Sequence, residues 1–224
     1  MMHLIVMFLF AASPAELEAS GLLIEAGTAW EEREDVPGQV RIMTTMLEDA
    51  LYSADVRRAW LLAGELSQLG ADNALLDFWM ARIAWCSGLR TEASDALARI
   101  ETPDPWLHHR ARGLSFLYGG NPREAVTQLA LSVSRAGTAR RGFYSSLDLS
   151  CALLASGETT KALEVSELLC AMFPTEALAT VMKGLCLQLS GQSAAAVREL
   201  TSLSPGHPPG ARNIATRLMR EFTE

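Results

Sequence analysis

A glycine followed five residues later by an alanine recurs along this 224-residue chain at intervals of 32, 37 and 34 residues. Each glycine ends one apolar stretch of helical character, and each alanine lies inside the next. A period near 34 residues is typical of stacked helical hairpins, because a single hairpin cannot bury its apolar face alone. The spacing therefore predicts an all-α solenoid. The pairs are Gly88/Ala93, Gly120/Ala125, Gly157/Ala162 and Gly191/Ala196, after a degenerate copy at Ala54/Ala59.

The composition agrees with helices throughout. Hydrophobic residues make up 49% of the chain and charged residues 20%, so disorder is not expected. The net charge is −7, and only Arg140-Arg141 and His108-His109-Arg110 form small basic clusters. Phosphate neutralisation needs a concentrated basic surface, so we expect no nucleic-acid partner.

Apolar periodicity, with glycine and proline between the stretches, predicts five helical hairpins followed by a capping helix. The expected first helices are 40–52, 74–87, 106–118, 143–155 and 177–189, and the expected second helices are 55–69, 90–101, 122–135, 158–172 and 192–203. Each first helix ends near its anchor, defined here as the glycine, or Ala54, of the recurring pair. Glycine accepts the left-handed conformation that closes a helix. The expected organisation is an N-terminal helix in 16–39, with Pro37-Gly38 as its break, then repeats over 40–210 and a capping helix over 211–224.

Further positions keep fixed distances from the anchors. Seven residues before each anchor the side chain is mostly small: Leu47, Ala81, Gly113, Ser150 and Gly184. Four residues before it lie Ala50, Ala84, Phe116, Leu153 and Leu187, and a proline ends the unit at Pro105, Pro174 or Pro208. Over residues 40–210 this pattern resembles the tetratricopeptide-repeat (TPR) family. The large residue expected early in each first helix is missing, so a Sel1-type or other helical-hairpin solenoid is an alternative. The residues in its place are Met43, Asp77, His109, Ser146 and Thr180.

The resemblance implies a concave groove, lined by the first helix of every hairpin, that binds a peptide segment or helix of a protein partner. Carboxylate-clamp residues are absent from these places, so an apolar occupant is expected. Alternatively, these side chains are buried between hairpins, or the chain's own helix at 15–33 fills the groove. The candidate groove residues are Leu75, Phe78, Arg82, Trp85, Leu107, Arg110, Leu114, Tyr118, Tyr144, Leu147, Leu178 and Val181.

Trp85, Tyr118 and Tyr144 are the expected binding anchors, because aromatic residues often dominate binding energy. Arg82 and Arg110 are expected to pair with acidic residues of a partner or with internal ones such as Asp77.

Motifs that carry chemistry are missing from the sequence. It has no phosphate-binding loop, no GxSxG elbow and no HExxH, and no Cys/His spacing suited to zinc. We therefore expect no enzyme activity, no catalytic residues, no metal site and no cofactor. Cys86, Cys151, Cys170 and Cys186 lie in apolar stretches and are read as free core thiols, with a Cys170–Cys186 disulfide as the alternative.

The N-terminus carries a nine-residue apolar run, Leu4 to Ala12, followed by Ser13-Pro14-Ala15. The run is too short to span a bilayer, and the small residues after it fit signal-peptidase cleavage, so residues 1–15 are a candidate signal peptide. No lysine or arginine precedes the run, which favours a buried flanking helix as the alternative. The leading hypothesis is a periplasmic or exported adaptor in a bacterial envelope complex that does not span the membrane. The alternatives are a cytoplasmic secretion chaperone and a structural subunit of a larger assembly.

Overall fold

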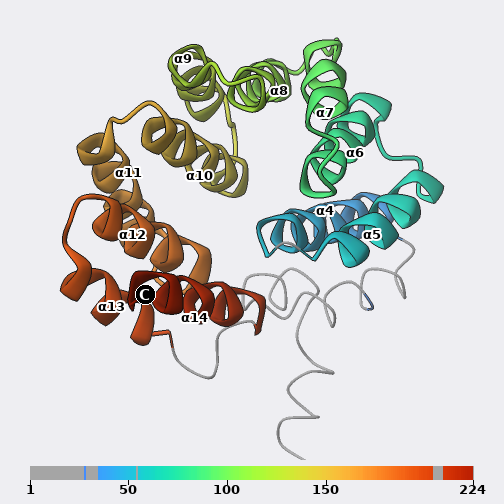
Figure 1. The fold of residues 1–224 in the computed structure, drawn as a ribbon. Coiled ribbons are helices and arrows are strands. Elements are labelled where there is room, and N and C mark those ends of the chain that lie inside the picture. Colours follow the sequence, from blue (N-terminus) through green and yellow to red (C-terminus); the bar gives the residue numbers. More distant parts are fainter. Residues whose placement is uncertain (1–27, 29–34, 54, 204–208, 224) are drawn as a thin grey trace, which may run out of the picture.

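The computed structural model describes residues 28, 35–53, 55–203 and 209–223, and these residues form helices joined by short turns without a strand. The helices follow one another in a curved row (Figure 1), which confirms the all-α solenoid. The first helices of the five hairpins are α4 (Val36–Tyr52), α6 (Asn73–Cys86), α8 (Pro105–Tyr118), α10 (Ala139–Ala155) and α12 (Ala177–Leu189). The second helices are α5 (Val56–Gln68), α7 (Arg90–Ala98), α9 (Pro122–Ser134), α11 (Thr159–Met172) and α13 (Ser193–Thr201), and α14 (Pro209–Thr223) follows them.

The recurring glycines and alanines have the roles that their spacing predicts. Gly88, Gly120, Gly157 and Gly191 have φ between 79° and 88°, the left-handed conformation in which a side chain would be strained. The recurring alanines of all five copies, Ala59 included, have no exposed surface. They lie where a second helix packs against its neighbours, so larger side chains would not fit.

Small residues seven positions before the anchors allow the two helices of a hairpin to cross closely. A Cβ atom added to Gly113 would lie 2.5 Å from Leu129 Cγ, and one added to Gly184 would lie 2.6 Å from Leu200 Cδ2. Both leucines belong to the second helix of the same hairpin. Glycine is required here by the closeness of the packed helices rather than by backbone conformation.

Two helices begin four residues earlier than the sequence suggests. The Pro37-Gly38 pair was expected to end a helix, but it lies in the first turn of α4, where the fixed φ of proline is favourable. The Asp35 carboxylate caps this helix by accepting a hydrogen bond from the Gly38 backbone N–H at 3.0 Å. Helix α10 begins at Ala139, because Thr138 caps it and the extra residues of this repeat join its first turn. The helix expected at 15–33 lies outside the described residues except for Thr28, which is helical.

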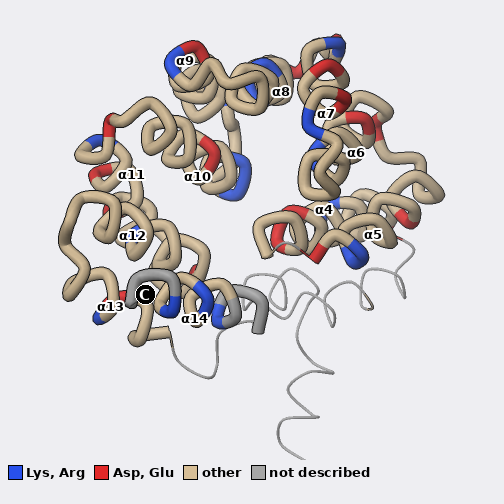
Figure 2. The backbone as a smooth tube through the Cα atoms, in the orientation of Figure 1, with Lys and Arg blue, Asp and Glu red and all other residues tan. Residues whose placement is uncertain are grey.

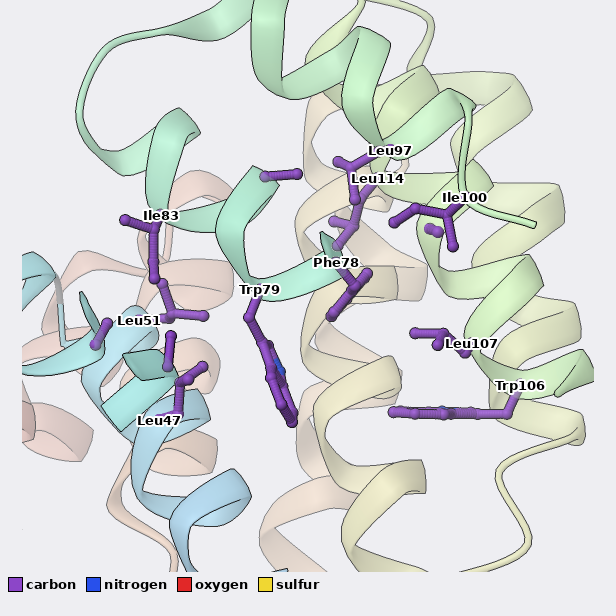
Figure 3. Close-up of a cluster of buried hydrophobic side chains, with 14 of the residues drawn as sticks. Leu47, Leu51, Phe78, Trp79, Ile83, Leu97, Ile100, Trp106, Leu107 and Leu114 are labelled. Carbon is purple, nitrogen blue, oxygen red and sulfur yellow. The ribbon is translucent and has the colours of Figure 1, made fainter. Parts of the chain in front are cut away.

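The apolar core runs along the stack between successive hairpins. Its first part extends from α4 to α10 and includes the fully buried Phe78 and Trp79 of α6 (Figure 3). Phe78 lies beside Leu107 and Leu114 of α8, whereas Trp79 extends toward α4. A second cluster extends from α10 to α12, and a third extends from α12 to α14. Within the described part of the chain, no helix is both long enough and apolar enough to cross a membrane.

Candidate interaction surfaces

Four charged side chains meet on the inner side of the first helices. Glu48 of α4, Arg82 of α6, Arg110 of α8 and Asp148 of α10 form this inner charge cluster, and no side chain in it is more than 6% exposed. Each of four successive hairpins contributes one member. The cluster therefore joins helices that are far apart in the sequence.

Direct ion pairs connect all four members. Arg110 binds Glu48 through Nη1 at 2.6 Å and Asp148 through Nε at 2.8 Å. Arg82 donates a short hydrogen bond to Glu48 and lies 3.6 Å from Asp148. Trp79 adds a hydrogen bond from its indole N–H to Glu48 Oε1 at 3.3 Å.

The two arginines and two carboxylates balance one another in charge. Burial alone would raise the pKa of Glu48, but Arg110 and Arg82 hold it at about 2, so the carboxylate stays ionised. Burying an unpaired charge is very unfavourable, and the ion pairs offset that penalty, although the buried Arg82 Nε has no hydrogen-bond partner in the described part of the chain. The chemistry of the cluster suits a structural core rather than a binding site for a charged ligand.

Tyrosines link α4 directly to α10 beside the charge cluster. The rings of Tyr52 and Tyr144 are stacked with centroids 5.7 Å apart, and the Tyr52 hydroxyl lies 3.1 Å from the Tyr144 carbonyl oxygen. The Tyr144 hydroxyl donates to Asp49 Oδ1 at 2.7 Å, with the Thr45 carbonyl at 3.2 Å. Burial raises the pKa of Asp49 to about 6, although Arg140 and Tyr144 act to lower it. The inner side of the first four hairpins is thus occupied by the protein's own side chains.

The candidate groove residues all lie on first helices, as expected, but none of them is exposed. Eight are buried: Phe78, Arg82, Leu107, Arg110, Leu114, Tyr144, Leu147 and Val181. The other four, Leu75, Trp85, Tyr118 and Leu178, are half-buried. Trp85 and Tyr118 come together in a stacked pair with ring centroids 3.8 Å apart. Burial between hairpins is therefore the arrangement found for most of the set, and partner binding by these residues stays a prediction.

An apolar groove lies on the opposite side of the first two hairpins, between α5 and α6. This outer groove has a volume of about 780 Å³. Trp60, Leu61 and Leu89 border it and are 57%, 59% and 52% exposed. The lining residues are Val56, Arg57, Trp60, Leu61, Met80, Ile83, Ala84, Ser87 and Leu89.

Charges elsewhere are spread over the stack, with basic and acidic segments interspersed in the view of Figure 2. No group of three or more His, Cys, Asp or Glu suited to a metal ion occurs in the described part of the chain. All four cysteines are free, but Cys86 is exposed at the end of α6, so it is not the core thiol that the sequence predicts. Burial raises the pKa of Cys151 to about 12 and that of Cys186 to about 11, which disfavours the reactive thiolate.

Solved structures with a similar fold are TPR proteins. A tetratricopeptide repeat protein from Parabacteroides merdae is similar over 93% of this chain and 86% of its own, with a TM-score of 0.52 and 13% identity. The chain has a TPR-like fold of stacked helical hairpins. YrrB, described as a TPR protein with an unusual peptide-binding site, is similar over 86% of this chain and 96% of its own, with a TM-score of 0.47 and 16% identity.

The TPR2AB domain of yeast Sti1, in complex with pHSP90, is similar over 95% of this chain and 96% of its own, with a TM-score of 0.43 and 13% identity. No protein-family model matches the sequence, and no curated protein does either. The assignment to a TPR-like fold therefore stands on the helices of the chain and on structural similarity.

The acidic partners of the two buried arginines in this TPR-like stack were not predicted from the sequence. The partners of Arg82 and Arg110 are Glu48 and Asp148, whereas Asp77, the expected internal partner, is exposed. A signal for the first partner does exist, because Glu48 and Arg82 both lie six residues before their anchors. Residues at equivalent positions of adjacent repeats face each other across the stack.

Proposed function

We propose that this TPR-like protein is a non-enzymatic adaptor that binds a segment of another protein. The outer groove is the observation that supports the proposal, since Trp60, Leu61 and Leu89 are each more than half exposed around one apolar depression. Contiguous exposed apolar surface is unfavourable in water and usually marks an interaction site. Tryptophan is also among the residues that most often dominate binding energy at interfaces.

We place this adaptor in a bacterial envelope assembly, as an exported protein. The support is the apolar run and small residues within 1–15, which lie outside the described residues. A cytoplasmic secretion chaperone would keep this segment, so mass spectrometry of the mature N-terminus separates the two proposals. A start near Glu16 would support export, and an intact Met1 would contradict it.

Affinity purification of the full-length protein from its own cells tests the adaptor function. The cells are treated with a short crosslinker before lysis, and the untagged strain serves as the control. We expect one or a few proteins at near-stoichiometric amounts, retained in buffer of physiological ionic strength. Recovery of the protein alone, as a monomer by sedimentation, would contradict the adaptor function.

A further inference from the structure

The first two repeats depart from the rest of the stack where they border the outer groove. Leu61 lies two residues after the recurring alanine Ala59. At this position the second helix of each of the other four hairpins is exposed to solvent, so a polar residue is expected. The other four copies do carry polar or charged residues there: Asp95, Thr127, Glu164 and Arg198.

Leu89 departs from the repeat in the same way. It lies directly after the anchor Gly88 and is the N-cap residue of α7, where it provides no side-chain hydrogen bond. Leucine is among the least favourable N-cap residues. The Asp55 carboxylate at the equivalent position caps α5 by accepting from the Arg58 N–H at 3.1 Å, whereas the equivalent residues of α9, α11 and α13 make no side-chain cap hydrogen bond. Both departures place an exposed leucine on the border of one groove, and Leu89 does so at the expense of the N-cap of α7. The equivalents of Leu89 in the other copies are all polar: Asp55, Asn121, Glu158 and Gln192.

The groove has the form that a third helix fits. On α5, Val56 and Trp60 are four residues apart, and so are Arg57 and Leu61, so these pairs share one face of the helix. On α6, Met80, Ile83, Ala84 and Ser87 follow the spacing i, i+3, i+4 and i+7 along one face. Two neighbouring helix faces with this spacing form ridges between which a further helix packs its own apolar residues.

The charge at the groove indicates the chemistry of its occupant. Arg57 is the one ionisable residue in the lining; it is exposed and makes no ion pair with the described residues. Arg58 and Arg90 follow the lining residues Arg57 and Leu89 in the sequence and are exposed without an ion pair within the described part of the chain, and the Arg90 guanidinium lies 5.4 Å from the centre of the Trp85 ring. The acidic residue Asp55 precedes the lining residue Val56. The chain as a whole carries a net charge of −7. The lining of the groove therefore carries one positive and no negative charge on an acidic protein, which favours a partner with acidic groups.

We propose that the outer groove binds an amphipathic helix of a partner protein, with apolar anchors on one face and Asp or Glu residues at its flank. The anchors lie between Trp60 and Leu61 on one side and Leu89 on the other, and a carboxylate pairs with Arg57. This inference rests on the proposed function and adds the binding surface and the chemistry of the partner segment.

A peptide library displayed on phage tests the proposal on the full-length protein. The probe is a set of helical peptides of about 16 residues, with Leu or Phe at i, i+3, i+4 and i+7 and with Glu, Lys, Gln or Ala at random elsewhere. We expect selection on the wild-type protein to enrich Glu over Lys. The selected peptides should lose on the order of tenfold in affinity for Leu61→Thr, the residue that Thr127 supplies in another repeat. Arg57→Glu should weaken binding severalfold and reduce its dependence on salt.

Matched variants separate a binding role from a loss of folding. Leu168→Thr changes an equally exposed leucine on α11, at 60% exposure, and should leave peptide affinity unchanged. Leu89→Asp introduces the residue that caps α5 at the equivalent position, so it should raise the Tm by about 2–4 °C while weakening peptide binding. A protein that melts later yet binds less well cannot have lost binding through unfolding.

Several outcomes would overturn the proposal. Enrichment of basic or neutral peptides would refute the acidic partner, and equal affinity for the wild-type protein and Leu61→Thr would refute the site. No enrichment above a bare support would refute both. A wild-type dimer that Leu61→Thr converts into a monomer would show that a second copy of the chain occupies the groove. If Leu61→Thr retains the partners recovered from cells, the adaptor function stands and this inference fails.

Discussion

Arg110 has no exposed surface, and its guanidinium lies between the carboxylates of Glu48 and Asp148. A buried ion pair of this kind adds little net stability, because desolvation offsets the attraction between the charges. Removing one partner is another matter, since it leaves a charge uncompensated in the core. At the scale of single residues, the charge cluster therefore fixes which helices meet, and its energetic importance is greatest when it is broken.

Glu48→Gln should destabilise the protein by about 3–5 kcal/mol at pH 7, because both arginines lose a carboxylate. The folded-state pKa of Glu48 is about 2, below its ordinary value of 4.5. Its contribution is thus complete above pH 4.5 and is lost as the pH falls toward 2. Urea unfolding of both proteins at a series of pH values measures this, and the difference between them should shrink over that interval.

Glu199→Gln is the matched control for this prediction. Glu199 pairs with Lys183 at 3.0 Å, but both side chains are about a quarter exposed. Solvent screens such a pair, so its loss should change stability by less than about 1 kcal/mol. A similarly small effect of Glu48→Gln would show that the charge cluster is hydrated or open in solution.

At the scale of the helical hairpin, close crossing determines which positions accept a side chain. Gly113 of α8 faces Leu129 of α9 at a distance that leaves no room for a Cβ atom. Gly64 of α5 is also helical but has no heavy atom within 4 Å of the place where its Cβ would be. Glycine weakens both helices equally, so only packing distinguishes the two positions.

Gly113→Ala and Gly64→Ala should consequently have opposite effects on stability. Overpacking at Gly113 costs about 1–3 kcal/mol, which exceeds the gain in helix propensity and leaves a net loss of about 1–2 kcal/mol. Gly64→Ala should gain about 0.5–1 kcal/mol. Thermal and chemical unfolding measure both changes. If Gly113→Ala leaves the free energy of unfolding unchanged, α8 and α9 cross less closely in solution than in this structure.

At the scale of the whole molecule, the stack closes on itself. An open solenoid has contacts between adjacent repeats alone, so unfolding of one repeat is coupled only to its immediate neighbours. Here the Tyr144 hydroxyl on α10 reaches Asp49 on α4, across 95 residues of sequence. The tyrosine stack and the charge cluster reinforce this link. We therefore expect α4 to α10 to unfold more cooperatively than an open repeat array would.

Tyr144→Phe tests this closure. It removes the hydroxyl that joins α10 to α4 and should cost about 1–2 kcal/mol. Hydrogen exchange should become faster in α4, far away in the sequence, while α12 stays protected.

Ser115→Ala is the control for this prediction, because Ser115 donates to the Ser94 carbonyl in the adjacent α7 at 3.0 Å. Its effect should stay within α7 and α8. Faster exchange confined to α10 in Tyr144→Phe would contradict a closed stack.

The repeat signal in the sequence was enough to predict the helices and their pairing. A position that requires a left-handed backbone selects glycine, and a tightly packed position selects alanine, so both can be recognised in the sequence. Gly157 and Ala162 are examples. Such constraints depend on backbone conformation and on packing within a hairpin. They repeat every 34 residues or so because the same contact repeats.

The curvature of the stack was decided only in three dimensions. Whether Arg82 and Tyr144 face an open groove depends on how far successive hairpins rotate, and that rotation sums many small contacts that no single motif encodes. The structure buries both against Glu48 and Asp49 of the first hairpin. It leaves Trp60 exposed, at a position where three other repeats carry the apolar residues Val126, Leu163 and Val197, so the sequence alone does not distinguish it from core residues. The sequence thus determined the helices through local constraints. Which side chains lie on the inner surface and which on the outer surface was determined only by the tertiary packing of all the hairpins.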